Sequence, residues 1–350
     1  MIIRSAQPSD NDALCRMERL TAQGTKIRLA EERQNFFCRA QQFPGGILLV
    51  AANETAGTLA GVMGGAPVRV RIAGRERQGA FIFDFRSNPE YQRGLHRAIF
   101  SLWQEVERRL LASGVEFMFG LVKEDNPTIS IYYRMGAQKK AERVFWTLPV
   151  YRKKRVPAGA EIHGTRDIAE DYRSAADWYR NYDLWPLLSP SELHPSIYNR
   201  CLRAEISYQG ASLKIWDSTR DFQRVVASAP WTYRWMRPIA RAVAGIIPVP
   251  RIPNIGDRLR TWLLYDMRLP SGSQGCSSLL AAANNLALAE GIDFLVVSAS
   301  PGEKELASAG RGSLATMRYH VLAKEYVPLP GFSDRTYFDV RFSELDCPAL

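Results

Sequence analysis

Apolar and polar positions follow two regular patterns along the first 150 residues. Short apolar or alternating runs predict strands, and runs with apolar positions three or four residues apart predict helices. Strands are predicted over 1–7, 46–52, 59–72, 78–85, 115–122 and 142–151. Helices are predicted over 8–20, 29–43, 95–113 and 126–134. The resulting order of strands and helices is typical of an α/β fold.

The clearest single element is the helix predicted over 95–113, because one of its faces is apolar and the opposite face is charged. Gly114 is expected to end this helix in the left-handed conformation that glycine adopts without strain. The turn Ala73-Gly74 is expected to join two antiparallel strands. The apolar face of the helix consists of Ile99, Leu102, Val106 and Leu110.

Two short segments of the first half are echoed, in the same order, in the second half of the chain. FDFRSNP at 83–89 is answered by YDMRLP at 265–270, and LASGVEFMFGLV at 111–122 by LAEGIDFLVVSA at 288–299. Both copies follow the order strand, loop, helix, glycine and strand. Two matches in one order predict a duplicated domain.

The boundary between the two copies is predicted at 152–170, where the chain is charged and contains proline and glycine, as linkers do. We therefore expect a first domain over 1–151 and a second domain over 171–350. A chain of 350 residues is long enough for two domains, and its 46% of apolar residues lets each domain build a core.

Composition also limits the compartment and the metal content. The N-terminus becomes polar at once, so no signal peptide is expected, and no apolar run approaches the roughly 20 residues that span a bilayer. The five cysteines are far apart and form no CxxC. We expect reduced thiols in a cytoplasmic protein without a metal site, in which His163, His194 and His320 are structural.

The formal net charge of +10 and the isoelectric point near 9.5 indicate anionic partners. Phosphorylated cofactors and acidic lipid headgroups fit this charge. Nucleic acid fits it poorly, because basic and acidic residues are mixed along the chain and no basic tail is present. Charge that only keeps the protein in solution is the alternative interpretation.

The residues NPEYQRGLHRAIF, at 88–100, connect a predicted strand to the clearest helix. A strand that leads through a glycine-containing turn into a helix directs backbone N–H groups and the positive end of the helix dipole toward one point. Such a point favours an anion. Arg93 and Arg97 are well placed to add charge-assisted hydrogen bonds to a diphosphate.

With these residues, the first 150 positions resemble the GCN5-related N-acetyltransferase (GNAT) superfamily. The element order matches, as do Pro89-Glu90-Tyr91 before the loop and Arg97-Ala98 in the helix. The stretch NPTISIYYRMGAQ at 126–138 is similar to the family's Asn…Tyr-x-x-x-Gly ending. The resemblance implies two GNAT-like domains in tandem, each a twisted mixed β-sheet flanked by helices. It also implies acyl-CoA, either acetyl-CoA or a longer thioester, as co-substrate without a metal.

The family's diphosphate motif, Gln/Arg-x-x-Gly-x-Gly/Ala, matches only in part. Gly94 fits the fourth position, but Tyr91 stands first, and His96 stands where the family has no large side chain. We therefore expect a modified coenzyme cradle. The coenzyme-binding residues that the resemblance implies are Gln92, Arg93, Gly94, Leu95, His96, Arg97 and Asn126.

The second half departs further from the family at the same places. Its loop at 269–276 contains glycines but no arginine, and SASPGEKELAS at 298–308 replaces the helix with asparagine and tyrosine. We expect this domain to have kept the fold and lost the standard coenzyme site.

GNAT-type transfer is a direct attack of an amine on the thioester, assisted by a base and by an acid that protonates the thiolate. Tyr132, four residues before Gly136, matches the tyrosine that often serves as this acid in the family. The alternative is that Tyr132 and Tyr133 only pack the helix. Glu124 and Asp125 are alternative bases at the mouth of the cleft, or simply exposed loop charges.

Asp84 is the other predicted base, because it interrupts the apolar strand AFIFDF. Burial there would raise its pKa toward a useful value. Arg86, on the same face of the strand, favours a structural pair instead. The repeat of this pair as Asp266 and Arg268 in the second half also favours structure, and both interpretations stay open.

One segment of the second half, 230–253, combines arginines and tryptophans at helical spacing. Such a helix is typical of a membrane interface near anionic lipid. The alternative is a helix that packs on the sheet of the second domain with its arginines in solvent. The arginine side consists of Arg234, Arg237 and Arg241, and the apolar side of Trp231, Trp235, Ile239, Ala242 and Ile246.

The resemblance implies an N-acyltransferase that moves an acyl group from acyl-CoA to an amine acceptor. A finer hypothesis is a long-chain donor and a lipid-like amine, such as a sphingoid base, with the enzyme peripheral on the inner face of the membrane. Three alternatives stay open. They are an acyltransferase that uses acyl carrier protein, a small-amine acetyltransferase, and a non-catalytic sensor that binds acyl-CoA.

Overall fold

The computed structural model describes residues 1–22, 24, 27–53, 55, 57–91, 95–126, 128–164, 168–189, 192, 200–244, 248–270 and 275–342. The first half contains β1 (Ile2–Ser5), α1 (Asn11–Leu20), β2 (Arg28–Glu32), β3 (Ile47–Asn53), β4 (Thr58–Ile72), β5 (Arg75–Ser87), α2 (Leu95–Leu111), β6 (Phe117–Lys123), α3 (Ile129–Arg134) and β7 (Gln138–Pro149).

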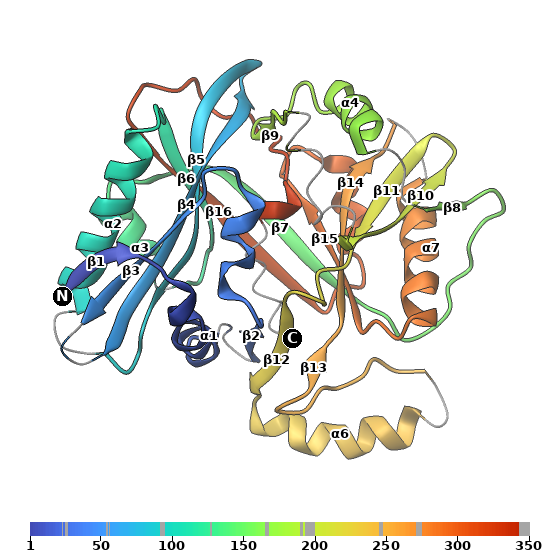
Figure 1. Ribbon diagram of the computed structural model, residues 1–350. Coiled ribbons are helices and arrows are strands. Elements are labelled where there is room, and N and C mark those ends of the chain that lie inside the picture. Colours follow the sequence, from blue (N-terminus) through green and yellow to red (C-terminus); the bar gives the residue numbers. More distant parts are fainter. Residues whose placement is uncertain are drawn as a thin grey trace.

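The second half repeats much of this order (Figure 1). It contains β8 (Glu161–His163), α4 (Ile168–Trp178), β9 (Trp185–Pro186), β10 (Leu202–Tyr208), β11 (Ala211–Trp216), β12 (Gln223–Ser228), α6 (Trp231–Ala244), β13 (Arg258–Leu259), β14 (Thr261–Arg268), α7 (Gly275–Ala289), β15 (Phe294–Ala299) and β16 (Ala315–Glu325). The predicted strands of the first half and the long helix α2 are confirmed to within a few residues.

The helix predicted over 29–43 is wrong. Leu29 and Ala30 lie buried in β2, which pairs antiparallel with β12 of the second half. The rest of the segment forms two short 3-10 helices, Phe36–Cys38 and Ala40–Gln42. The backbone partner of β2 comes from the distant second half, so the local spacing of apolar residues did not indicate a strand.

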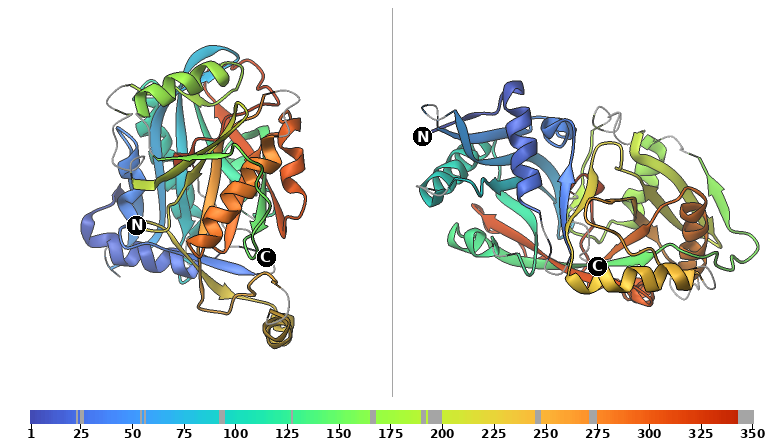
Figure 2. Two further views of the ribbon diagram at one scale, coloured as in Figure 1. Left: turned by 90° about the vertical axis from the view of Figure 1, so that its right-hand side faces the viewer. Right: turned by 90° about the horizontal axis from the view of Figure 1, so that it is seen from below.

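One mixed sheet runs through both halves, and each half lends its last strand to the other. The strand order is β1-β3-β4-β5-β6-β16-β7-β15-β14-β11-β10-β8 among the described residues. Strand β16 pairs antiparallel with β6 of the first half, and β7 pairs antiparallel with β15 of the second half. This exchange joins the halves through backbone hydrogen bonds at the centre of the molecule (Figures 1 and 2).

Both faces of the first half's sheet are covered, as expected for nearly continuous apolar strands. On one face, Leu14 and Met17 of α1 pack over an aromatic layer. On the other face, Leu102 and Val106 of α2 pack over residues that alternate with that layer along the same strands. The aromatic layer consists of Phe43, Phe81, Phe83, Phe117 and Phe119.

Helix α2 lies very close to β4, because glycines face it. A Cβ atom on Gly61 would stand 2.8 Å from Ile99, and one on Gly65 would stand 2.8 Å from Leu110. Real Cβ atoms do not approach other carbons so closely, and interiors are packed too densely to yield easily. These glycines therefore leave room for the side chains of Ile99 and Leu110 on α2, whose N-terminus follows the predicted anion loop.

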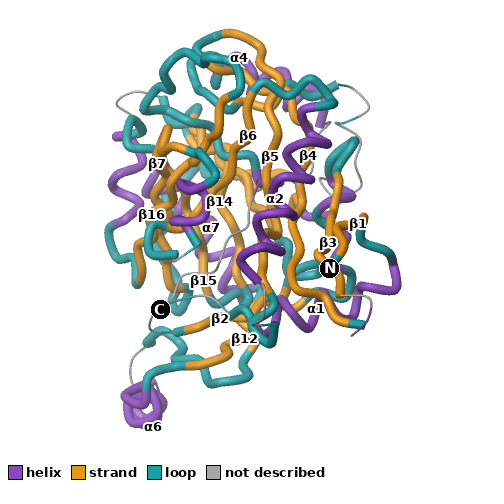
Figure 3. Tube along the Cα trace, turned by 90° about the vertical axis from the view of Figure 1, so that its left-hand side faces the viewer, coloured by secondary structure: helices purple, strands orange, loops and turns teal. Residues whose placement is uncertain are grey.

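The predicted linker at 152–170 is not wholly irregular, because it contains β8 and the first residues of α4. The division into domains at this point stays a prediction. A second, three-stranded sheet has the order β13-β12-β2. It forms an arm that joins the two halves and carries α6, which stands clear of the body at one end of the molecule (Figures 1 and 3).

Two of the compositional expectations concern membranes and thiols. No helix among the described residues is long and apolar enough to cross a membrane. Four of the five cysteines lie in the described part of the chain and are free thiols, namely Cys15, Cys38, Cys201 and Cys276. Burial raises the pKa of Cys38 to about 11, so its thiol stays protonated near neutral pH.

Candidate functional site

The echoed segments of the two halves adopt the same unusual backbone conformation. Asp84 in β5 has a φ of +50°, and Asp266 in β14 has a φ of +47°. Both lie where the antiparallel pairing shifts in register, opposite Val62–Gly64 in the first half and Ser212–Lys214 in the second. A non-glycine residue in this conformation is uncommon, and an irregularity of this kind bends the strand. The sequence echo therefore corresponds to the same bulge in both halves.

Beyond the bulge of the first half, β5 separates from β6. The parallel ladder between them runs from Gly79–Phe117 to Phe81–Phe119. A pocket of about 430 Å³ lies beyond this ladder, and we call it the β5–β6 pocket. Its lining residues are Leu20, Thr21, Ala22, Gly24, Arg28, Phe85, Arg86, Ser87, Pro89, Lys123, Asp125, Asn126 and Thr128.

The walls of the β5–β6 pocket combine apolar surface, from side chains such as Leu20 and Phe85, with positively charged side chains. Lys123 ends β6 and forms an ion pair of 3.1 Å with Asp125. Arg28 also lines the pocket and donates to the carbonyl oxygen of Ala22 at 2.7 Å. The Asn126 Oδ1 atom accepts hydrogen bonds from the residue-128 backbone and hydroxyl at 2.9 Å and 2.7 Å, which fixes the start of α3. The pocket thus presents cations and a rigid asparagine.

The predicted coenzyme loop adjoins this pocket through Ser87 and Pro89. Gln92, Arg93 and Gly94 lie outside the described residues. Leu95 is half-buried at the start of α2, and His96 and Arg97 are exposed on its first turn. The side chains of His96 and Arg97 are therefore exposed at the start of α2, and neither is among the described residues that line the pocket.

Tyr132 is buried on α3, whereas its neighbour Tyr133 is 45% exposed. The Tyr132 ring packs edge-on against Phe85 and Trp103, with ring centroids 5.7 Å and 5.5 Å away. Phe85 itself lines the β5–β6 pocket. The structure therefore places Tyr132 one side chain behind the pocket wall.

Asp84 does not line the pocket, but it belongs to a buried cluster of six charged side chains of which one, Arg86, does. Arg33 donates to Asp84 at 2.9 Å, and Arg39 also contacts this carboxylate. Arg33 further forms two hydrogen bonds of 2.7 Å with Glu18. The cluster contains three guanidinium groups and three carboxyl groups, and burial raises the pKa of one of the latter, Glu18, to about 7. Its members are Glu18, Glu31, Arg33, Arg39, Asp84 and Arg86.

The expectation that burial gives Asp84 a raised pKa is wrong. Burial alone would raise the pKa, but the neighbouring guanidinium groups, foremost those of Arg33 and Arg39, outweigh it and lower the pKa below its ordinary value. A carboxylate that is held ionised by arginines accepts a proton poorly. The geometry therefore favours the structural interpretation of Asp84 over the catalytic one.

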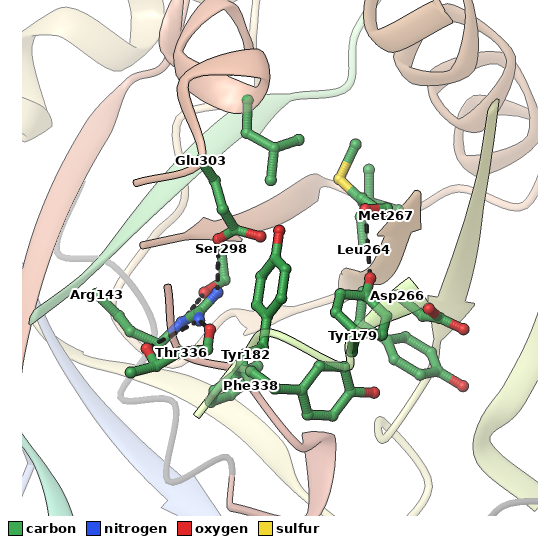
Figure 4. A pocket seen from close by; sticks show the side chains of 13 residues that line it. Arg143, Tyr179, Tyr182, Leu264, Asp266, Met267, Ser298, Glu303, Thr336 and Phe338 are labelled. Atoms are coloured by element: carbon green, nitrogen blue, oxygen red, sulfur yellow. Dashed lines mark hydrogen bonds and ion pairs between the residues drawn. The ribbon is translucent and has the colours of Figure 1, made fainter. Parts of the chain in front are cut away.

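The second half has an equivalent opening, but its own side chains fill it. The ladder between β14 and β15 runs from Thr261–Phe294 to Leu264–Val297, and a small pocket lies beyond it. Figure 4 shows Tyr182 in the middle of this pocket, with Arg143 on one side and Tyr179 on the other. The buried Arg143 donates to Ser298 at 2.9 Å and to the Thr336 carbonyl. This filling is consistent with the predicted loss of the coenzyme site.

Asp266, at the second bulge, is also held ionised. Burial would raise its pKa, but Lys214 and Arg268 outweigh burial and lower the pKa to about 2. Arg268 donates to the Asp266 carboxylate at 2.9 Å and 2.7 Å, and Lys214 contacts it as well. The paired aspartates therefore stabilise corresponding bulges in the two halves.

The stability of the protein is expected to fall in acid because of Asp266. A carboxyl group whose pKa is lower in the folded than in the unfolded protein stabilises the fold at pH values above its unfolded pKa, here 3.8. This stabilisation is lost as the pH falls from about 4 toward 2. We expect a loss of about 2 kcal/mol from this residue. Urea unfolding between pH 5 and pH 2.5 measures it, and an Asp266→Asn variant should show a shallower pH dependence. An equal slope in both proteins would contradict this assignment.

Several residues of the site were not found from the sequence. Lys123 and Arg28 line the pocket, and Arg33 and Glu18 hold Asp84. The position of Lys123 at the end of a predicted strand was a usable signal, because strand ends commonly meet at a site. The buried charged residues carried no such signal, because residue type alone does not distinguish a buried arginine or glutamate from a solvent-exposed one.

The remaining predicted histidines differ in their surroundings, because both ring nitrogens of His320 are buried without a hydrogen-bond partner among the described residues. His163 shares a hydrogen bond of 2.8 Å with Ser207, and the buried His320 lies 3.9 Å from Glu124. His194 lies outside the described residues. No group of three or more potential metal-binding side chains occurs within the described ranges.

Comparisons with known proteins identify the fold. No protein-family model and no curated protein sequence matches the chain. The solved structures of Saccharomyces cerevisiae N-myristoyltransferase with bound myristoyl-CoA are similar to it. One has a TM-score of 0.61 at 10% identity and covers 97% of this chain and 85% of that chain. A second, with inhibitors, has a TM-score of 0.61 at 11% identity, with 97% and 84% covered.

This similarity extends over nearly the whole chain, so it includes both halves and the strands that they exchange. The chain has the fold of N-myristoyltransferase, and the predicted mixed α/β architecture is confirmed.

Proposed function

We propose that this protein is an N-acyltransferase, because its fold is similar to that of N-myristoyltransferase. It takes the acyl group from an acyl-CoA bound in the β5–β6 pocket and passes it to an amine by direct attack. The observation that carries this proposal is the pocket itself. It opens where β5 leaves β6, beside the start of α2, and its walls carry Arg28 and Lys123.

The chain's own residues supply three functions in this proposal. The α2 N-terminus with Arg97, together with Lys123, attracts the phosphates. Asn126 fixes the wall of the pocket through its hydrogen bonds to the start of α3. Tyr132 is the acid in this proposal, and because it lies behind Phe85 it protonates the departing thiolate only where the thioester sulfur reaches past that ring. Asp125 is the one acidic residue among the described lining residues, and in this proposal it accepts the proton of the amine.

The finer hypothesis of a long-chain donor and a lipid-like amine belongs to this proposal. The structures of N-myristoyltransferase contain a long-chain thioester, myristoyl-CoA, and this supports testing long-chain donors first. A carrier-protein donor, a small amine and a non-catalytic sensor use the same pocket, so the experiment below separates them.

Acyl-CoA is expected to stabilise the protein against heat, and filling the pocket should abolish this effect. At a ligand concentration 100-fold above Kd the gain is about 2.7 kcal/mol. CoA, acetyl-CoA and palmitoyl-CoA are compared by thermal unfolding of the wild type and of Ala22→Trp, whose new side chain occupies the pocket. Ala112→Trp, on an exposed residue after α2, is the matched control.

Turnover is then measured as thiol release from the preferred acyl-CoA in the presence of soluble and lipid-like amines. Binding without amine-dependent release would indicate a sensor. Release only from acyl carrier protein would indicate the carrier-dependent enzyme. Equal stabilisation of wild type and Ala22→Trp would overturn the assignment of the β5–β6 pocket.

A further inference from the structure

The outward face of α6 is apolar and exposed. Trp231, Trp235 and Ile239 are 71%, 70% and 65% exposed, and Met236 is 51% exposed. The first three lie four residues apart, so they form one stripe along the helix. The alternative in which this helix packs on the sheet of the second domain is therefore wrong.

The opposite side of α6 is attached to the arm that carries it. Arg237 contacts Asn254, in the segment that leads to β13. Arg237 lies on the far side of the helical wheel from the stripe, so this contact turns the tryptophans away from the body. Figures 2 and 3 show the helix clear of the rest of the molecule. The stripe is thus held outward by the fold.

Positive charge is concentrated in the same region. Residues 218–260, which include α6 and its arm, contain eight arginines and two aspartates. This stretch therefore carries a net charge of +6, whereas the whole chain carries +10. Within α6 itself there are three arginines and no acidic residue.

We propose that α6 docks on an anionic lipid bilayer, with the stripe of Trp231, Trp235, Met236 and Ile239 inserted at the headgroup level. Tryptophan is favoured at this depth, because its ring is apolar and its N–H can still find a polar partner. The net positive charge of residues 218–260 attracts anionic headgroups to the same surface. The combination of exposed tryptophans and local positive charge suits a charged bilayer better than a neutral apolar partner.

The place of α6 in the arm links this surface to the β5–β6 pocket. Ser228, at the end of β12, pairs with Arg28 of β2, which is one of the residues that line the pocket. Trp231 follows Ser228 by three residues, and three extended residues span at most about 10 Å. A bilayer that holds α6 is therefore close to the pocket. Delivery of a lipid substrate from that bilayer rests on the proposed function, whereas docking does not.

Vesicle flotation of the full-length protein tests the docking surface. Vesicles of phosphatidylcholine with phosphatidylglycerol are compared with vesicles of phosphatidylcholine alone. We expect binding to the anionic vesicles that weakens with salt. A Trp231→Ser/Trp235→Ser variant should bind at least about tenfold more weakly. Trp178→Ser, which changes an exposed tryptophan on α4 at the other end of the molecule, is the matched control.

Brominated lipid provides a second readout, because it quenches tryptophans that enter the bilayer. Quenching in the wild type and its loss in the double variant would support insertion. Failure of the wild type to float with anionic vesicles, or equal flotation of the double variant, would overturn the proposal. A wild-type dimer without lipid that the double variant lacks would also overturn it, in favour of a second copy of the chain on the stripe.

These readouts are separate from those of the proposed function. Thermal stabilisation by acyl-CoA is expected to be the same in the double variant and the wild type, because the stripe lies outside the pocket. Loss of flotation with retained stabilisation would therefore identify the docking surface alone. Flotation without any stabilisation by acyl-CoA would leave the docking surface in place and remove the acyl-CoA site.

Discussion

An Asp84→Asn variant is expected to lose about 3–5 kcal/mol of unfolding free energy, because it leaves a buried positive charge without its counter-charge. Asp84 and Arg33 both have fully buried side chains, 2.9 Å apart. The amide has nearly the same shape as the carboxylate, so the change in stability reports the charge and not a cavity. This is the largest stability effect that we expect from a single substitution near the site.

The measurement is urea unfolding at neutral pH, with Glu90→Gln as the control. Glu90 forms an ion pair of 2.9 Å with Arg16, but both side chains are more than half exposed. Exposed pairs contribute less than about 1 kcal/mol, so the control should stay close to wild type. If Asp84→Asn kept its stability and lost only turnover, the structural assignment would fail and the catalytic one would stand.

A Tyr132→Phe variant is expected to lose about 10²–10⁴-fold in kcat, the usual contribution of a general acid. The phenylalanine ring keeps the edge-on contacts with Phe85 and Trp103. The folded structure should therefore survive while the proton donor is removed. Steady-state kinetics with the preferred acyl-CoA, together with thermal unfolding, measure both effects.

The adjacent tyrosine provides the control for this experiment. Tyr133 is 45% exposed on the same helix, and Tyr133→Phe should leave kcat unchanged. The pH dependence adds a readout that packing does not affect, because loss of an acid removes one limb of the pH–rate profile. Equal kcat values for Tyr132→Phe and wild type would sink the role of Tyr132 and leave it as a packing residue.

Local sequence was sufficient for the elements whose contacts are local. The apolar stripe of α2 and the strands from β3 to β7 follow from periodicity, because burial on one or two faces repeats with the geometry of the element. The echo of Asp84 in Asp266 was also readable from the sequence. It indicated the duplication, and both residues have the same left-handed backbone conformation in corresponding strands.

Which residues surround the buried Asp84 could not be predicted from local sequence. Arg33 comes from a segment predicted as a helix, and its partner Asp84 lies 51 residues further along the chain. Whether Asp84 is a base or an ion-pair partner depends on how many cations surround it. That number is set by which distant segments fold against β5, and no local pattern records it.

The amino-acid sequence by itself determined the succession of strands and helices, the tandem arrangement, the resemblance to GNAT enzymes and the amphipathic character of α6. Only the tertiary structure decided that the halves exchange β7 and β16, that Tyr182 fills the second opening, and that the tryptophans of α6 face outward. The physical reason is how far apart in the chain the interacting residues lie. Periodicity reflects backbone geometry within one element, whereas pairing, filling and exposure depend on contacts between residues far apart in the chain.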